Sequence, residues 1–119
     1  DEGVVARLDF HEVSFLLTGD ITAGAEFDLM QTGQPVKSTV LKVGHHGSRT
    51  STTEQFVEAV NPVLAIVTTG IKNQFGHPHE DVIARLSNHL STESVYVTRD
   101  RGTVTVATDG NRIWVVADR

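Results

Sequence analysis

The chain reads Val40-Leu-Lys-Val-Gly-His45-His46-Gly-Ser48 where an apolar run gives way to glycine, two adjacent histidines and a second glycine. Glycine lets the backbone turn sharply and lets other groups approach it closely. We therefore expect a strand over 38–43 that holds the two imidazoles at its end. An imidazole in such a place serves as a metal ligand or as an acid and base near neutral pH.

Two other predicted strands also lead into polar residues. The strand at 13–18 is followed by Asp20, and the strand at 63–68 runs into a loop that carries His77. Where strands alternate with helices, the sheet is layered and ligands bind at the carboxyl ends of its strands. The pattern therefore predicts that Asp20, His45 and His77 meet at one edge of a sheet. One carboxylate and two imidazoles are a ligand set of catalytic metal sites.

The rest of the pattern is typical of an α/β protein with a mixed sheet and flanking helices. Apolar residues three or four apart indicate helices, and turn residues such as Asp109-Gly110 separate strands. Ser51 and Glu54 form a capping box at a helix start, and Pro78 suits the first turn of another helix. Strands are predicted at 4–10, 13–18, 38–43, 63–68, 95–98, 103–108 and 112–117, and helices at 23–31, 51–60 and 80–90.

Composition restricts the function further. The 119 residues fit one domain, 1–119, and contain no apolar run of the roughly 18 residues needed to span a membrane. Cysteine is absent, which leaves histidine and carboxylates as ligands. The net charge of −5 argues against tight electrostatic binding of nucleic acid by this chain alone. The charge does not exclude a nucleic-acid substrate that is held by a metal or by another domain.

Each candidate ligand also has a simpler interpretation. Asp20 could cap the helix at 23–31, the histidine pair could be polar loop residues, and His77 could be a poor helix cap. The apolar run before Asp20 and the glycines around His45 and His46 favour a ligand or acid–base role for these residues. The residues do not say which histidine of the pair has that role.

Three further residues are close enough in sequence to hold a substrate oxyanion or phosphate. They are Lys42, Ser48 and Asn73, for which a solvated strand face (Lys42) or loop structure (Ser48 and Asn73) is an equally good interpretation. The remaining histidines have predicted structural positions only, in a hairpin turn, in a solvent-facing first helical turn and near a helix end: His11, His79 and His89.

Four motifs carry a resemblance to a known family. They are Phe15-Leu-Leu-Thr-Gly-Asp20, Leu41-Lys-Val-Gly-His-His-Gly-Ser48, Asn73-x-Phe-Gly-His-Pro78 and Tyr96-Val-Thr-x-Asp-x-Gly102. In order and spacing they resemble the metallo-β-lactamase-fold domain of ComEC-type DNA-internalisation competence proteins. The chain is similar to the C-terminal half of that domain, which implies half of an αββα sandwich.

The resemblance also implies chemistry and partners. Asp20 would match the carboxylate that bridges two divalent metal ions, zinc or manganese. His45 or His46 would match the later histidine ligand, with His77 a further candidate. The implied activity is hydrolysis of a phosphodiester, as in degradation of the DNA strand that is not imported. The implied setting is bacterial: a soluble domain of an inner-membrane channel protein, on a side left open.

One signature of that fold is absent. The motif His-x-His-x-Asp-His does not occur in the chain, and by resemblance it belongs upstream. We therefore expect the chain to be a piece of a longer polypeptide that needs the upstream half of the domain. Alone, it should bind metal weakly, lack activity and expose a sheet edge that favours a homodimer.

Two alternatives remain. A metallo-β-lactamase-fold hydrolase of another phosphoester, soluble and unrelated to DNA uptake, would contain the same motifs, because fold does not fix substrate. A catalytically silent α/β module that binds DNA or a partner protein would contain Asp20 and His45 as relics. Long apolar segments upstream in the parent polypeptide would separate the DNA-uptake protein from the soluble hydrolase. Absence of the upstream histidine and aspartate cluster would favour the silent module.

Overall fold

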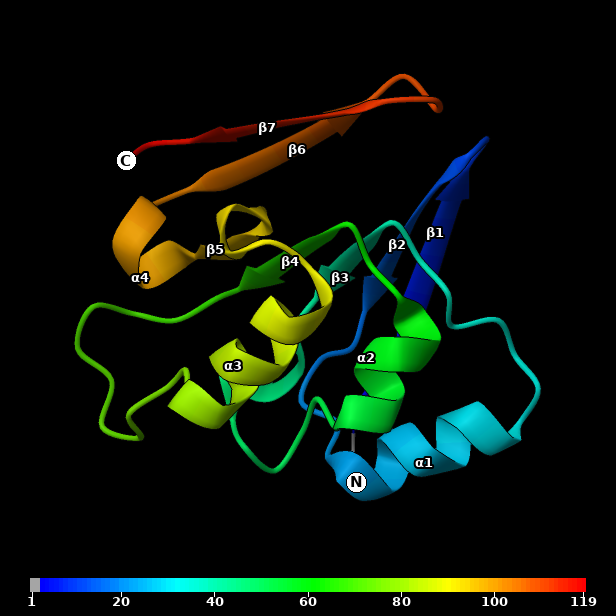
Figure 1. Ribbon diagram of the computed structural model, residues 1–119, viewed down its shortest axis with the longest axis horizontal. Helices are drawn as coiled ribbons and strands as arrows, with labels where there is room; N and C mark the ends of the chain where they lie inside the picture. The colour runs from blue at the N-terminus through cyan, green and yellow to red at the C-terminus, as the bar shows by residue number, and fades with distance from the viewer. Residues whose placement is uncertain (1–2) are drawn as a thin grey trace.

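Five strands form the central sheet of the computed structural model, which describes residues 3–119, so that Asp1 and Glu2 of the predicted domain lie outside the described residues. β1 is antiparallel to β2, whereas β2, β3, β4 and β5 run parallel, in the spatial order β1-β2-β3-β4-β5 (Figure 1). The bounds are Ala6–Phe10 (β1), Val13–Leu17 (β2), Val40–Lys42 (β3), Leu64–Val67 (β4) and Val95–Val97 (β5). The predicted mixed sheet and first hairpin are confirmed.

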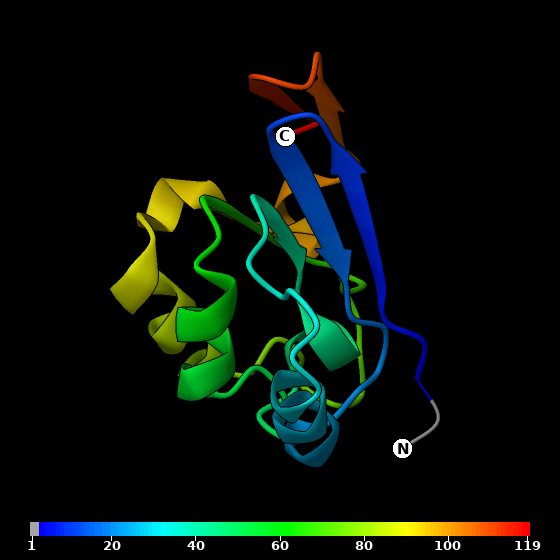
Figure 2. The same cartoon turned by 90° about the vertical axis from the view of Figure 1, so that its right-hand side faces the viewer.

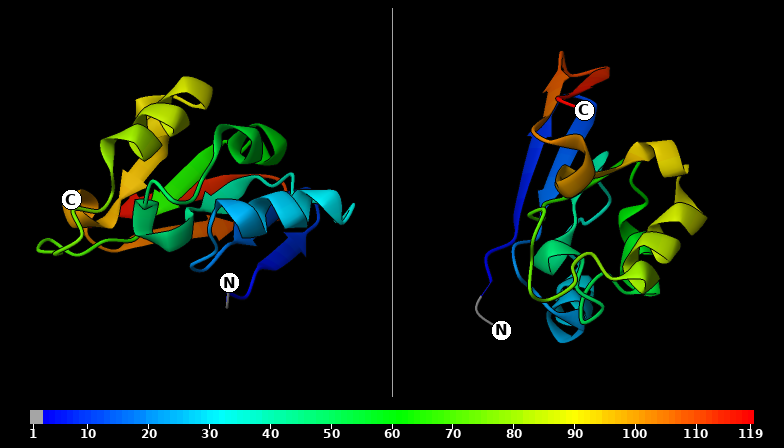
Figure 3. Two further views of the ribbon diagram at one scale, coloured as in Figure 1. Left: turned by 90° about the horizontal axis from the view of Figure 1, so that it is seen from below. Right: turned by 90° about the vertical axis from the view of Figure 1, so that its left-hand side faces the viewer.

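Helices α2 and α3 cover one face of this sheet (Figures 1 and 3). Alternate side chains of a strand point to opposite faces, so Leu41 of β3 and Val67 of β4 enter this layer. They are buried there in one apolar cluster with Phe56 of α2 and Leu86 of α3. Burying a side chain of this kind contributes about 1.5–3 kcal/mol. The helices are α1 (Ala23–Gln31), α2 (Glu54–Val60), α3 (Glu80–His89) and the one-turn elements η1 (Gly44–Gly47), η2 (Thr92–Ser94) and α4 (Thr98–Arg101).

Strands β6 (Val104–Thr108) and β7 (Ile113–Ala117) form a separate antiparallel ribbon. The ribbon lies on the face of the sheet opposite α2 and α3 (Figures 2 and 3). One turn-to-turn contact fixes it there: the Glu12 amide donates to the Gly110 carbonyl at 2.7 Å. A Cβ at Gly110 would lie 2.7 Å from the His11 ring, so this approach requires glycine. His11 thus supports the join between the two β layers.

Three local predictions are wrong, and for the starts of α2 and α4 a distant residue decides the outcome. The N-cap of α2 is Thr53, whose hydroxyl accepts from the Phe56 amide, while the Ser51 hydroxyl donates to the Ile21 carbonyl at 2.5 Å. Buried Glu26 of α1 accepts from the amides of Thr52 and Thr53, so the helix starts later than the predicted capping box.

The other two differences concern helix and strand ends. Pro78 precedes α3, because the N-cap of that helix is His79. Between β5 and β6 the chain forms α4, whose first residue, Thr98, was predicted to end the strand at 95–98. The Thr98 hydroxyl accepts from the Thr69 amide and donates to the Thr69 carbonyl, both at 2.9 Å, which holds the start of α4 against the end of β4. The helix then leads the chain to the second β layer.

The layers are therefore helices, a five-stranded sheet and a two-stranded ribbon. The α/β class, the mixed sheet and the flanking helices agree with the prediction. Within residues 3–119, none of the helices has both the length and the apolar character to cross a membrane.

Candidate functional site

The carboxyl ends of the parallel strands carry the candidate residues, as predicted. Asp20 follows β2, His45 and His46 lie in η1 directly after β3, and His77 and His79 end the long loop after β4. Because β2, β3 and β4 are neighbours and parallel, these ends share one edge of the sheet. We call this the histidine edge.

The histidine pair adopts a backbone conformation that L-residues rarely occupy. His45 has φ 52° and ψ 37°, His46 has φ 55° and ψ 29°, and Gly47 continues the turn with φ 81°. The left-handed region costs a non-glycine residue about 1–2 kcal/mol. The His45 amide donates to the Gly19 carbonyl at 2.8 Å, which fixes the turn to the end of β2. Strain of this kind in other proteins clusters at active sites and ligand clamps.

Hydrogen bonding determines which ring nitrogen of His46 is available to bind a ligand. Its Nδ1 donates to the Thr68 carbonyl at 2.8 Å, so in the neutral ring Nε2 carries the lone pair. Nε2 lies 3.6 Å from Oδ1 of Asp20. Two ligands on one tetrahedral zinc ion lie about 3.3–3.6 Å apart, given bonds of about 2.0–2.2 Å. Asp20 and His46 therefore fit a shared ion, with the carbonyl orienting the imidazole from behind.

His45 and His77 complete a cluster of imidazoles. Their ring centroids are 5.9 Å apart, and Nδ1 of His45 is 3.3 Å from the Thr50 hydroxyl. Burial lowers the pKa of His77, and repulsion by the positive charges of His79, His45 and His46 lowers it further. A lowered pKa favours the neutral imidazole, which is the form that binds metal.

His79 is tied into the loops rather than facing solvent, so that prediction is wrong. Its Nδ1 accepts from the Arg49 amide at 2.8 Å, and its Nε2 donates to the Phe75 carbonyl at 3.2 Å. Its own amide donates to the Gly47 carbonyl at 3.0 Å. One residue thus joins the histidine turn, the chain at Arg49 and the loop after β4. Histidine is a poor N-cap residue. Its position directly before a predicted helix was therefore a sequence signal that His79 has another structural role.

Two of the three residues predicted to hold substrate, Asn73 and Ser48, form hydrogen bonds within their own loops. Asn73 accepts from the His77 amide at 2.7 Å and donates to the His77 carbonyl at 2.8 Å, so it closes the loop that presents His77. Ser48 is buried and accepts from the Thr50 amide at 3.3 Å. Loop structure, the alternative interpretation, describes both arrangements.

Lys42 is the last residue of β3, at the histidine edge. It is half-buried, and its Nζ donates to the Val43 carbonyl at 3.2 Å. Burial lowers the pKa of Lys42, and the negative charge of Asp20 partly opposes this effect. The ammonium group is therefore held by a backbone carbonyl, within electrostatic range of Asp20.

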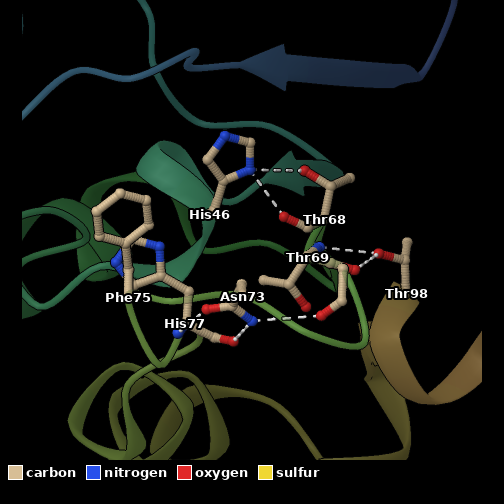
Figure 4. A pocket seen from close by; sticks show the side chains of 8 residues that line it. His46, Thr68, Thr69, Asn73, Phe75, His77 and Thr98 are labelled. Atoms are coloured by element: carbon tan, nitrogen blue, oxygen red, sulfur yellow. Dashed lines mark hydrogen bonds between the residues drawn. The ribbon is translucent and has the colours of Figure 1, made fainter.

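A pocket of about 420 Å³ opens next to His46 and His77 (Figure 4). Phe75, which the sequence analysis missed, stands at its rim with 66% of its surface exposed. The Phe75 and His77 rings stack with centroids 5.6 Å apart and planes inclined by 26°. The pocket, called the Phe75 pocket below, is lined by His46, Thr68, Thr69, Gly70, Asn73, Phe75, His77 and Thr98.

A second group of potential ligands lies away from the strand ends. Across residues 3–119, Glu54, Glu58 and His89 are the one set of three or more carboxylates and imidazoles whose ligand atoms all lie within 4.8 Å of one another. His89 already bonds Oε1 of Glu54 at 2.5 Å. At the histidine edge, Nε2 of His46 and Oδ1 of Asp20 form a pair 3.6 Å apart, and no set of three within residues 3–119 meets the same distance criterion there.

Comparisons with known proteins agree with part of the resemblance. The chain is 39% identical over 89 residues to ComE operon protein 3 of Bacillus subtilis, covering 75% of this chain and 12% of that protein. It is 41% identical over 87 residues to Recombination protein 2 of Haemophilus influenzae, covering 73% and 11%.

A third relative is named as a competence protein. Competence protein ComA of Neisseria gonorrhoeae is 40% identical over 86 residues, covering 71% of this chain and 12% of that protein. The chain is similar to bacterial competence proteins. It spans only 11–12% of the length of these relatives. No family model and no solved structure matches the chain.

Proposed function

We propose that the chain is part of a metal-dependent phosphodiesterase or nuclease-like domain of a bacterial DNA-uptake protein, with the metallo-β-lactamase-like fold suggested by its motifs. The observation that carries this proposal is the left-handed histidine turn, which holds Nε2 of His46 3.6 Å from Oδ1 of Asp20. Similarity to proteins named for competence supports the biological setting.

The donor set suits zinc or manganese. Asp20 and His46 would hold the ion, and His45 and His77 are the next donors along the same edge. When bound, such an ion supplies Lewis acidity and a source of hydroxide at neutral pH, which is the chemistry that phosphodiester hydrolysis needs. Upstream residues of the parent polypeptide would supply the remaining ligands of a two-metal site.

The residues of this chain have defined parts in that scheme. Thr68 orients His46, and Asn73 holds the loop of His77. Lys42 ends β3 within electrostatic range of Asp20, and its ammonium group would attract the negatively charged phosphodiester. Each of these groups binds or orients, and none requires a change in the backbone.

Exposed apolar surface supports an intramolecular partner. Leu8 and Phe10 on the outer strand β1 are 55% and 48% exposed, and Trp114 and Val116 on β7 are 50% and 66% exposed. An outer strand with apolar side chains invites pairing with another segment. We propose that the upstream half of the domain covers these surfaces in a membrane-channel protein, and that without it two copies of the chain associate.

Calorimetric titration with zinc and manganese tests the metal proposal. The chain should bind weakly, and a version extended upstream by about 120 residues, roughly one more half-domain, should bind at micromolar concentration or tighter. In the extended version Asp20→Ala and His46→Ala should weaken binding by more than the roughly 10–100-fold typical of losing an outer-sphere partner. His45→Ala should cost less than His46→Ala.

The matched control removes the other potential ligand group. The double variant Glu58→Gln/His89→Ala disables the cluster around Glu54 and should leave the tight site intact. The extended protein should also hydrolyse a single-stranded oligodeoxynucleotide in an Asp20-dependent manner. Binding that depends on Glu58 and His89 but not on Asp20 would refute the assignment, and so would metal-loaded extended protein without hydrolytic activity.

A further inference from the structure

The Phe75 pocket offers a binding surface that adjoins the residues assigned to the metal, and its Phe75, Asn73 and threonine side chains have no part in holding the ion. We propose that it holds one unpaired nucleobase of a single DNA strand, stacked at the rim on Phe75, next to the scissile phosphodiester. This inference rests on the proposed function, because His46 both lines the pocket and faces Asp20. A base in the pocket would therefore lie beside the candidate metal centre.

The first argument is the state of the Phe75 ring. It is 66% exposed, so it contributes little to the core, yet its loop is held firmly. Its carbonyl accepts from His79, and Asn73 closes the loop by bonding both the amide and the carbonyl of His77. The ring is stacked on His77 and so presents a flat, preorganised apolar face to solvent. Bases of any sequence stack on such faces.

The second argument is the chemistry of the walls. The residues that line the pocket include no carboxylate, lysine or arginine, so the pocket suits an uncharged ring rather than a phosphate. Threonine hydroxyls from the ends of β4 and β5 supply polar groups. Among residues 3–119 the Thr69 hydroxyl has no hydrogen-bond partner, but its oxygen is closed off from solvent.

The third argument is size. A volume of about 420 Å³ lies within the 300–1,000 Å³ typical of small-molecule pockets. A single nucleobase is small enough to enter a pocket of this volume. Enzymes that act on bases or single strands bind unstacked bases in pockets of this kind.

Titration of the isotope-labelled chain by NMR, in EDTA and 50 mM salt, tests the proposal without involving metal. The probes are a short oligodeoxythymidine and an abasic oligonucleotide of the same length. We expect the base-bearing strand to bind more tightly than the abasic strand, with shifts at Thr69 and Asn73. Phe75→Ala should weaken binding of the base-bearing strand roughly 5–150-fold, the equivalent of losing one base–aromatic stack, and leave the abasic strand unaffected.

Two variants make the result specific. Phe75→Trp should retain the preference for bases, since it keeps a stacking face. Phe27→Ala removes a comparably exposed phenylalanine, 58% exposed on α1, and should change nothing. Equal binding of both strands, binding of neither strand, or a Phe75→Ala variant with unchanged affinity would each overturn the base pocket. Because EDTA removes metal, such a failure stays separate from failure of the zinc titration.

Discussion

Gly47 is the point where the histidine turn touches the loop that presents His77. Its φ is 81°, and a Cβ built there would lie 2.6 Å from Cβ of Pro78, 3.0 Å from its Cα and 3.1 Å from Val67. Its carbonyl also accepts from the amide of His79. The substitution Gly47→Ala therefore tests whether the two loops of the histidine edge are packed as the structure has them.

Two costs add at this position. An L-residue in the left-handed region costs about 1–2 kcal/mol, and overpacking against a ring and a buried valine costs about 1–3 kcal/mol. Gly47→Ala should thus lower the free energy of unfolding by about 2–5 kcal/mol. Gly33 separates the two terms, because its φ of 79° is nearly the same and a Cβ there meets nothing within 4 Å. Gly33→Ala should cost only the first term, about 1–2 kcal/mol.

Urea unfolding of both variants and the parent, followed by circular dichroism, measures the difference. The unfolding midpoint should fall further for Gly47→Ala than for Gly33→Ala at an unchanged m-value, which indicates that the surface exposed on unfolding is the same. In the extended protein, Gly47→Ala should also weaken zinc binding, since Pro78 must move and His77 with it. Equal destabilisation by the two substitutions would show that the loops are not in contact at Gly47 and would refute this account of the histidine edge.

Two further predictions concern pH. Burial raises the pKa of Glu26 despite hydrogen bonds from Thr53 and Thr52 and the charge of Arg85. In the folded state Glu26 then keeps its proton to higher pH than in the unfolded state. The parent chain should therefore lose stability relative to Glu26→Gln as pH rises above about 4.5. If the free energies of unfolding of the two proteins, measured in urea, changed in parallel from pH 4 to 8, this would be contradicted. For His77, whose pKa is lowered, an NMR titration should give a midpoint below 6.5, and its contribution to stability should be lost as pH falls through that midpoint. A midpoint at or above 6.5 would contradict the packing of His77 among other imidazoles.

The elements of the fold were predictable because their signals are local. Strand runs such as 13–18 and 63–68 and the period of α3 specify burial over a few residues. The start of α2 was not predictable from the sequence, because Ser51, Thr52 and Thr53 are all acceptable N-cap residues in isolation. Glu26, on another helix, selects among them by accepting from two of their amides. A contact between residues so far apart in sequence leaves no periodic signal.

The candidate site was likewise predictable where the signal is local and not where it depends on distant contacts. Parallel strands place Asp20, His45 and His77 at one edge, and the alternation of strands and helices sufficed to predict this. The choice between His45 and His46 depends on the Thr68 carbonyl, which only the folded chain brings within 2.8 Å of His46. Phe75 belongs to one of the quoted motifs, but its role was missed because the motif does not show that the ring is exposed and stacked on His77 at the rim of a pocket.

The geometry of the histidine edge bears on why this chain should bind metal weakly by itself. A catalytic zinc site takes three protein ligands, and in the proposed site Asp20 and His46 would supply two at a suitable separation. The ring of His77 is 5.9 Å from that of His45, and Nδ1 of His45 faces Thr50 instead. Closing a third bond would require movement of loops that Asn73, His79 and the Gly47 contact hold in place. A rigid edge with two ready ligands gains more from a third ligand delivered by another segment than from its own rearrangement. Tight binding should therefore appear only when that segment is present.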